Sequence, residues 1–159
     1  SRLLPRVGPR TLMVAGFALA AVGLVAFTQV HADSTYLAHI LPAELLTSFG
    51  MGTSFVPLSS TALIGVDPAD AGVASALVNT TQQTGGSLGV ALLNTVAASA
   101  TSGYLASHGQ AAARAAAVHG YTTAFLVSTA LLGAASVACL LLLRATRHDV
   151  SPEPELVMV

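Results

Sequence analysis

The chain has few charged residues and little of the chemistry that soluble enzymes and nucleic-acid-binding proteins use. Of its 159 residues only 8% are charged, there is no lysine or tryptophan, and the formal net charge is −1. This composition excludes a polybasic surface for nucleic acid. The single cysteine, Cys139, excludes an internal disulfide and a thiolate metal cage. His108 and His119 have no evident third ligand, so we expect no metal site and no bound cofactor.

What the chain has instead is hydrophobic sequence. It is 53% hydrophobic, with a mean hydropathy of +0.74, which is typical of membrane proteins. A helix needs about 20 apolar residues to cross the hydrocarbon core. The sequence therefore predicts an all-α membrane protein with four transmembrane helices, and not an enzyme. The four predicted spans are residues 11–30, 36–64, 72–98 and 121–143, joined by segments 31–35, 65–71 and 99–120.

The arginines predict how these spans are oriented. An even number of spans puts both ends of the chain on one side, and five of the six arginines lie there: Arg2, Arg6, Arg10, Arg144 and Arg147. Arg114 alone lies in the opposite loops. The positive-inside bias then predicts that both termini are cytoplasmic, with residues 1–10 a basic loop. Residues 144–159, which contain two Pro-Glu pairs, read as a disordered cytoplasmic tail.

The third predicted span, residues 72–98, is the most informative part of the chain. It has no formal charge, yet it carries the amides Asn79, Gln82 and Gln83. Together with Gly72, Ser75 and Gly86 these residues recur mostly at steps of three and four, so they form one stripe on a helix. Lipid-facing helices have no use for such a stripe, whereas helices that line a wet pathway or pack on other helices do. The amides therefore bind substrate or water, or they join helices together; the sequence leaves both interpretations open.

Glycine and proline suggest where helices pack or bend. Gly85 and Gly89 are four residues apart, a spacing that permits close approach of another helix. The second span contains Gly50, Gly52 and Pro57. Because proline has no backbone N–H to donate, Pro57 is expected to bend this helix. The bend is interpreted as a gating hinge or, equally, as a static packing kink.

Glu44 is the only carboxylate within the predicted spans. A carboxylate inside the membrane is by default a functional hypothesis, here a proton carrier or a counter-charge for a cationic substrate. The alternative is a structural role, since Pro42 and Glu44 also have the pattern of a helix start, with an acid in the first turn. In that case Glu44 lies at the outer interface.

Two segments resemble the major facilitator superfamily, and within it the fourteen-span drug:proton antiporters. Residues 1–10 resemble a degenerate copy of the cytoplasmic loop motif G-x-L-x-D-R-x-G-R-R: Leu3, Arg6, Gly8 and Arg10 agree, whereas Ser1, Pro5 and Pro9 depart from it. The second match is more specific. It comprises Phe49-Gly50-Met51-Gly52, Val56-Pro57-Leu58, and the segments 67–79 and 82–90, and it resembles the end of such antiporters.

This resemblance implies that the chain is a C-terminal fragment, the last four spans of a fourteen-span transporter. Its implied function is proton-coupled multidrug efflux by alternating access, with amphipathic or cationic small molecules as substrates and the proton gradient as driving force. The implied partners are the lipid bilayer of a bacterial plasma membrane and the N-terminal spans of the same transporter. Asn79, Gln82, Gln83 and Glu44 are then the candidates for the substrate pathway.

Two other classes remain open from the sequence. One is an independent four-span membrane protein, such as a small multidrug pump that dimerises. The other is a non-transporting structural membrane subunit, in which the amide stripe only joins helices. An upstream reading frame with ten more spans would exclude the first class, and loss of transport without loss of expression in Gln82 and Gln83 variants would exclude the second.

Overall fold

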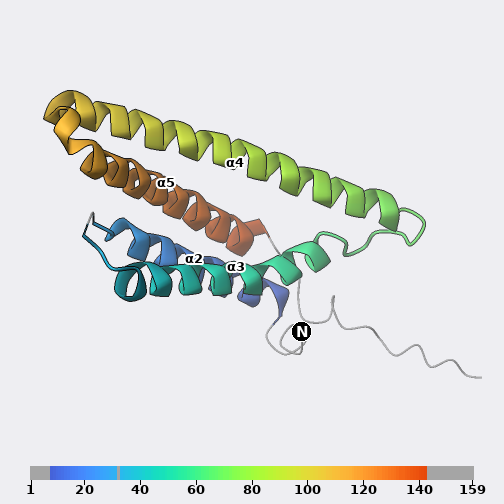
Figure 1. Cartoon of the computed structure of the whole chain (residues 1–159). Coiled ribbons are helices and arrows are strands. Elements are labelled where there is room, and N and C mark those ends of the chain that lie inside the picture. The colour runs from blue at the N-terminus through green and yellow to red at the C-terminus, as the bar shows by residue number, and fades with distance from the viewer. Residues whose placement is uncertain (1–7, 32, 143–159) are drawn as a thin grey trace, which may run out of the picture.

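The chain folds into four long helices that form two antiparallel hairpins (Figure 1). The structure is a computed structural model, which describes residues 8–31 and 33–142. Every regular element in these ranges is helical, which confirms the predicted all-α fold. In chain order they are α2 (Pro9–Thr28), the π-helical turn η1 (Tyr36–Ile40), α3 (Leu41–Thr61), α4 (Ala71–His108), the short 3₁₀ helix η2 (Gln110–Ala112) and α5 (Ala113–Leu142).

The ends of two helices differ from the prediction. We expected residues 99–120 to be a connecting segment, and this was wrong: α4 continues to His108, and α5 begins at Ala113. The reason is the alanine content of this stretch, because alanine has the highest helix propensity. The chain reverses direction at Gly109, whose φ of 77° is accessible to glycine at little cost.

Three helices are long and apolar enough to cross a membrane by length and composition: Pro9–Thr28, Ala71–His108 and Gln110–Leu142. Helix α3 is not among them, because proline, glycine, serine, threonine and Glu44 lower its hydropathy. At 38 residues, α4 is about 57 Å long, well beyond the roughly 30 Å of a hydrocarbon core. Most of the expected basic loop (residues 1–7) and the expected tail (144–159) lie outside the described residues, with Arg2, Arg6, Arg144 and Arg147.

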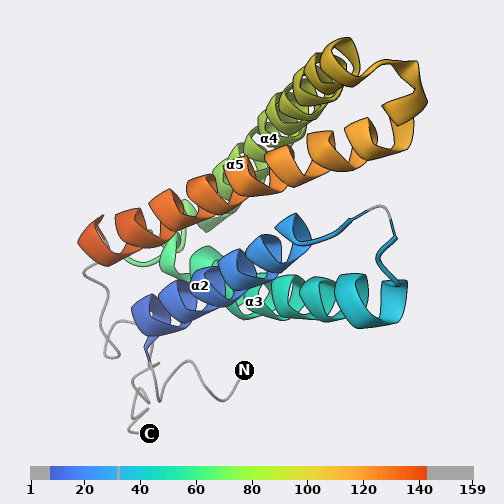
Figure 2. The same cartoon turned by 90° about the vertical axis from the view of Figure 1, so that its left-hand side faces the viewer.

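Helix α2 joins the two hairpins. It packs against α3 along one side and against α5 along another, while α4 packs against α5. Figure 2 shows the consequence: the α4–α5 hairpin crosses over the α2–α3 hairpin, with α5 the nearer of its two helices to α2. At one end, the Arg10 guanidinium donates a hydrogen bond to the carbonyl oxygen of Leu140, which ties the start of α2 to the end of α5.

The contact between α2 and α3 depends on small residues. A methyl group added at Gly50 would lie 2.5 Å from the carbonyl oxygen of Gly16 and 2.9 Å from the Cα atom of Ala20. At Gly23, an added methyl group would lie 2.9 Å from the Ala43 carbonyl oxygen. All three distances are below van der Waals contact, so only glycine allows the backbones to approach this closely. We call this contact the α2–α3 seam.

A buried serine adds a polar bridge to the seam. The Ser54 side chain is 1% exposed, and its hydroxyl lies 3.0 Å from the carbonyl oxygen of Gly50 and 3.4 Å from that of Met13 in α2. The buried hydroxyl is therefore satisfied across the helix pair. Pro57, one turn further on, is also fully buried. Helix α3 continues through it to Thr61, so Pro57 is a packing residue at this position, while its role as a hinge stays a prediction.

A second close contact holds the α4–α5 hairpin. A methyl group added at Gly120 would lie 2.6 Å from the carbonyl oxygen of Ala97, and it would also meet the Thr101 hydroxyl. Ala116 and Ala124, one turn before and one turn after Gly120, are buried as well. In α4 itself no residue is buried. The helix is thus held along one side by α5 and is otherwise open among the described residues.

The seam makes a prediction about neighbouring glycines of α3. Replacing Gly50 with alanine should lower the free energy of unfolding by about 1–3 kcal/mol, because the added methyl group overpacks the contact. The matched control is Gly52→Ala, since nothing lies within 4 Å of a methyl group there. That change should leave stability equal or higher by up to about 1 kcal/mol, because alanine favours the helix. Thermal unfolding of the detergent-purified proteins measures both; equal melting temperatures would contradict the seam.

Candidate substrate pathway on helix α4

The amide side chains of α4 are available for binding because few described groups compete for them. Asn79 and Gln83 are exposed, and Gln82 is half-buried. Three hydroxyls of this helix are already occupied: those of Thr80, Ser87 and Thr95 donate to backbone carbonyl oxygens one turn earlier in α4, at 2.8–2.9 Å. A side-chain amide both donates and accepts hydrogen bonds, so these three residues have hydrogen-bonding capacity to offer a ligand, water or another helix.

Gln82 is the amide with the strongest need for a partner. Its Nε2 atom is buried, and it has no hydrogen-bond partner among the residues that the structure describes. A buried donor without a partner costs about 1–3 kcal/mol. A substrate, a water molecule or a further helix that accepts from Nε2 would recover this free energy, so Gln82 marks a point where the site is incomplete.

The helix face that follows Gln82 borders a hollow between the two hairpins. The hollow has a volume of about 430 Å³ and lies between all four long helices. Gly85 and Gly89 of α4 line it, opposite Leu24 of α2 and Met51 of α3. Because Gln82, Gly85 and Gly89 are three and four residues apart, they share one face of α4. The amide stripe thus leads into a largely apolar space in which one glycine face forms a wall.

Four of the glycines expected to have a packing or hinge role have no close neighbour among the described residues. Nothing described lies within 4 Å of a methyl group added at Gly85, Gly86 or Gly89, and the same holds for Gly52 of α3. Close helix approach at Gly85 and Gly89 therefore stays a prediction, which no helix of the described residues fulfils. Spacing permits close approach but does not require it, and here α5 contacts a different stretch of α4. Gly50 alone of the predicted set is a packing glycine.

Glu44 lies apart from the amides. It sits in the first turn of α3, after Pro42, and its carboxylate accepts a hydrogen bond of 3.1 Å from the hydroxyl of Tyr36. The side chain is exposed. Helix α3 starts at the end of the bundle where α4 finishes, whereas Gln82 lies in the first third of α4 (Figure 1). This placement favours the helix-start interpretation, and it does not bring Glu44 together with the amide stripe.

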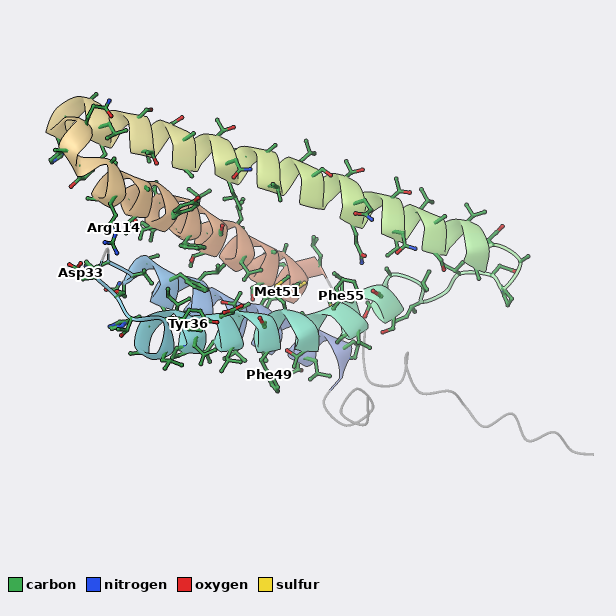
Figure 3. All side chains as sticks on the ribbon, viewed as in Figure 1. Asp33, Tyr36, Phe49, Met51, Phe55 and Arg114 are labelled. Carbon is green, nitrogen blue, oxygen red and sulfur yellow. The ribbon has the colours of Figure 1, made fainter. Side chains whose placement is uncertain are left out.

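The residues that line the hollow from the other hairpin could not be predicted from the sequence. Leu24, Thr47 and Met51 come from two helices, and each reads as an ordinary apolar or small position. Figure 3 illustrates the division along α3: Phe49 points away from the bundle, and its side chain is 70% exposed. Which side of α3 faces the hollow depends on the seam with α2. A signal was present for the seam itself, namely small residues four apart at Gly16 and Ala20 and at Gly50 and Ser54.

Comparison with known proteins identifies the family. The puromycin resistance protein pur8 of Streptomyces alboniger is 46% identical over 136 residues, which cover 83% of this chain and 27% of that protein. The uncharacterized MFS-type transporter YcnB of Bacillus subtilis (strain 168) is 31% identical over 130 residues, or 82% of this chain and 26% of that protein. The chain belongs to the major facilitator superfamily. The cephamycin export protein CmcT of Amycolatopsis lactamdurans is 46% identical over 109 residues, which cover 67% of this chain and 22% of that protein.

These matches confirm the resemblance to drug transporters of the major facilitator superfamily, although no family model matches the chain. The chain spans about a quarter of the length of these relatives. Together with the apolar helices, they identify a membrane protein of this superfamily.

The open surroundings of the α4 glycines lead to a prediction that contrasts them with Gly120. Gly85→Ala and Gly89→Ala should keep wild-type thermal stability, because each methyl group enters the hollow. Gly120→Ala should lower the free energy of unfolding by about 1–3 kcal/mol, since its methyl group meets the Ala97 carbonyl oxygen. Thermal unfolding of the whole transporter distinguishes them. Destabilisation by Gly85→Ala equal to that by Gly120→Ala would mean that another span fills the hollow at this point.

Proposed function

We propose that the chain forms the last four spans of a fourteen-span multidrug efflux antiporter, which exports amphipathic or cationic small molecules by alternating access. Relatives whose names denote puromycin resistance, cephamycin export, lincomycin resistance and multidrug resistance support drug export. The unpartnered Gln82 amide beside the hollow is the structural observation that carries the proposal, because it offers a hydrogen bond at the edge of an apolar space.

In this proposal α4 supplies a polar wall of the substrate pathway. Drug sites are mostly apolar hollows with a few well-placed polar groups, and this combination is present where Gln82 adjoins the glycine face. Gln82, Gln83 and Asn79 orient a substrate by hydrogen bonds, while the hollow accommodates its apolar part. The hollow opens on a helix that only α5 holds among the described elements, so the remaining spans of the transporter complete the pathway.

The driving force in the proposal is the proton gradient, with no bound cofactor. Glu44 is exposed and hydrogen-bonded to Tyr36 at the end of the bundle, and this environment supports an interfacial position for it. We therefore assign proton coupling mainly to acidic residues of the other spans. Glu44→Gln is expected to change the pH dependence of export only if the carboxylate is inside the bilayer.

The proposal makes a prediction for export by the whole transporter. Gln82→Ala and Gln83→Ala should each weaken resistance, because the loss of about 1.4 kcal/mol of substrate binding changes affinity tenfold. Thr95→Val is the matched control, since its hydroxyl already donates to the Ala91 carbonyl oxygen in α4. Drug-resistance and proton-flux assays at matched expression provide the measurement. If both glutamine variants and Glu44→Gln keep wild-type resistance and coupling, the amides are scaffold and the site lies in other spans.

A second prediction concerns orientation in the plasma membrane. Both termini are proposed to be cytoplasmic, because five of the six arginines fall on that side. In a background without other cysteines, Ser34→Cys should react with an impermeant maleimide added to intact cells, whereas His148→Cys should react only after the membrane is opened. Labelling of His148→Cys from outside would reverse the proposed topology.

A further inference from the structure

Two adjoining hollows lie at the end of the bundle where α2 and α4 finish and α5 begins. The first, of about 230 Å³, is largely apolar, and its lining includes the aromatic residues Phe27, Tyr121 and Phe125. The second, of about 410 Å³, is lined by polar side chains, among them Thr28, Asp33, Tyr104 and Thr122. The two share the wall residues Val30, Val118 and Thr122. A ligand longer than either hollow can therefore occupy both.

The apolar hollow has an aromatic wall that is held in place. The rings of Phe27 in α2 and Phe125 in α5 stack with centroids 4.8 Å apart and an angle of 22° between their planes. Aromatic faces attract both other rings and organic cations. The wall thus suits a planar or aromatic group, including one that carries a delocalised positive charge.

The polar hollow presents acceptors to a ligand. The hydroxyl of Thr28 donates to the Val25 carbonyl oxygen at 2.7 Å, and that of Thr122 donates to the His119 carbonyl oxygen at 3.0 Å. Each hydroxyl has one proton, so both oxygens have only lone pairs left to offer. The exposed carboxylate of Asp33 adds a further acceptor and a negative charge. Such a surface fits a hydrogen-bond donor with positive charge.

The basic groups nearby are accounted for. Arg114 points toward the loop that carries Asp33 (Figure 3), and it is engaged in an interaction within the chain. The His119 ring packs against Tyr104, with centroids 5.1 Å apart, and the His108 ring stacks on the same tyrosine at 4.0 Å. His31 lines the polar hollow as well. Asp33 is the carboxylate among the residues that line this hollow.

We propose that the two hollows together form a second binding site, which takes amphipathic amines with an aromatic part at the outer end of the transporter. The aromatic part occupies the hollow beside Phe27 and Phe125, and the protonated amine reaches Asp33 and Thr122. The assignment of exported amines as ligands, and of this end as the outer one, rests on the proposed function. Tyr104 lies about 33 Å along α4 from Gln82, so this site is distinct from the amide stripe.

The experiment uses the full-length transporter in lipid nanodiscs, with rhodamine 6G as the probe, an aromatic cation with N–H donors. Equilibrium dialysis gives the number of bound probes, and fluorescence anisotropy gives their affinities. The wild type should bind two equivalents. Asp33→Asn should weaken one of them about tenfold, because it removes a charge-assisted hydrogen bond, and Thr122→Val should weaken the same one about threefold. Asp67→Asn, an exposed acid in the loop at the opposite end, is the matched control and should keep both equivalents.

The neutral dye Nile red separates charge from folding. Its binding to Asp33→Asn should equal that of the wild type, and the melting temperature should be unchanged, because Asp33 is exposed in a loop. Rhodamine 6G binding by Asp33→Asn that matches the wild type overturns the second site, as does a wild type that binds no probe. A wild type that binds one equivalent, itself weakened by Asp33→Asn, supports this site and counts against the amide stripe. The proposed function is tested separately. If the protein binds two equivalents, one of them sensitive to Asp33→Asn, but gives cells no resistance, the second site stands and drug export is contradicted.

Discussion

The close approach of α2 and α3 through small residues determines the arrangement of the other helices. At Gly16, Gly23 and Gly50 the two helices are so close that a side-chain methyl group would clash with the facing helix, and the Ser54 hydroxyl bridges the pair. Because one side of α2 is used in this seam, α5 packs on another side, and α4 follows α5. A membrane offers little hydrophobic driving force between helices, so such contacts and buried hydrogen bonds carry the association.

The seam also explains why the hairpins enclose hollows instead of a solid core. The described part of α4 has its packed contacts with α5 around Ala97 and Gly120, and the glycine face from Gly85 to Gly89 is left without a neighbour within 4 Å. That face then borders a space of about 430 Å³. In the proposed transporter the same arrangement places the Gln82 amide at the edge of the pathway and keeps the aromatic and acidic groups of the other end available for amines.

Much of the fold was predictable because it follows from local sequence. The four long helices were predicted from apolar stretches, and the helix start at Pro42 and Glu44 from its residue pattern. The segment 99–120 was misjudged because loop length was inferred from hydropathy, whereas alanine propensity continued both helices up to Gly109. Among the candidate site residues, the exposure of Asn79 and Gln83 agrees with a polar stripe; the role of that stripe in transport stays a prediction.

By itself the sequence determined that the chain is helical, that it is a membrane protein, and that one helix carries amides and glycines on a shared face. These are properties of composition and period, which need no partner to be defined. Only the tertiary structure decided which glycines pack and which border open space. Gly50 and Gly52 are two residues apart and chemically identical, yet one meets the backbone of α2 and the other meets nothing within 4 Å. A close contact depends on where the atoms of a second helix lie, and the spacing of residues within one helix does not specify this position.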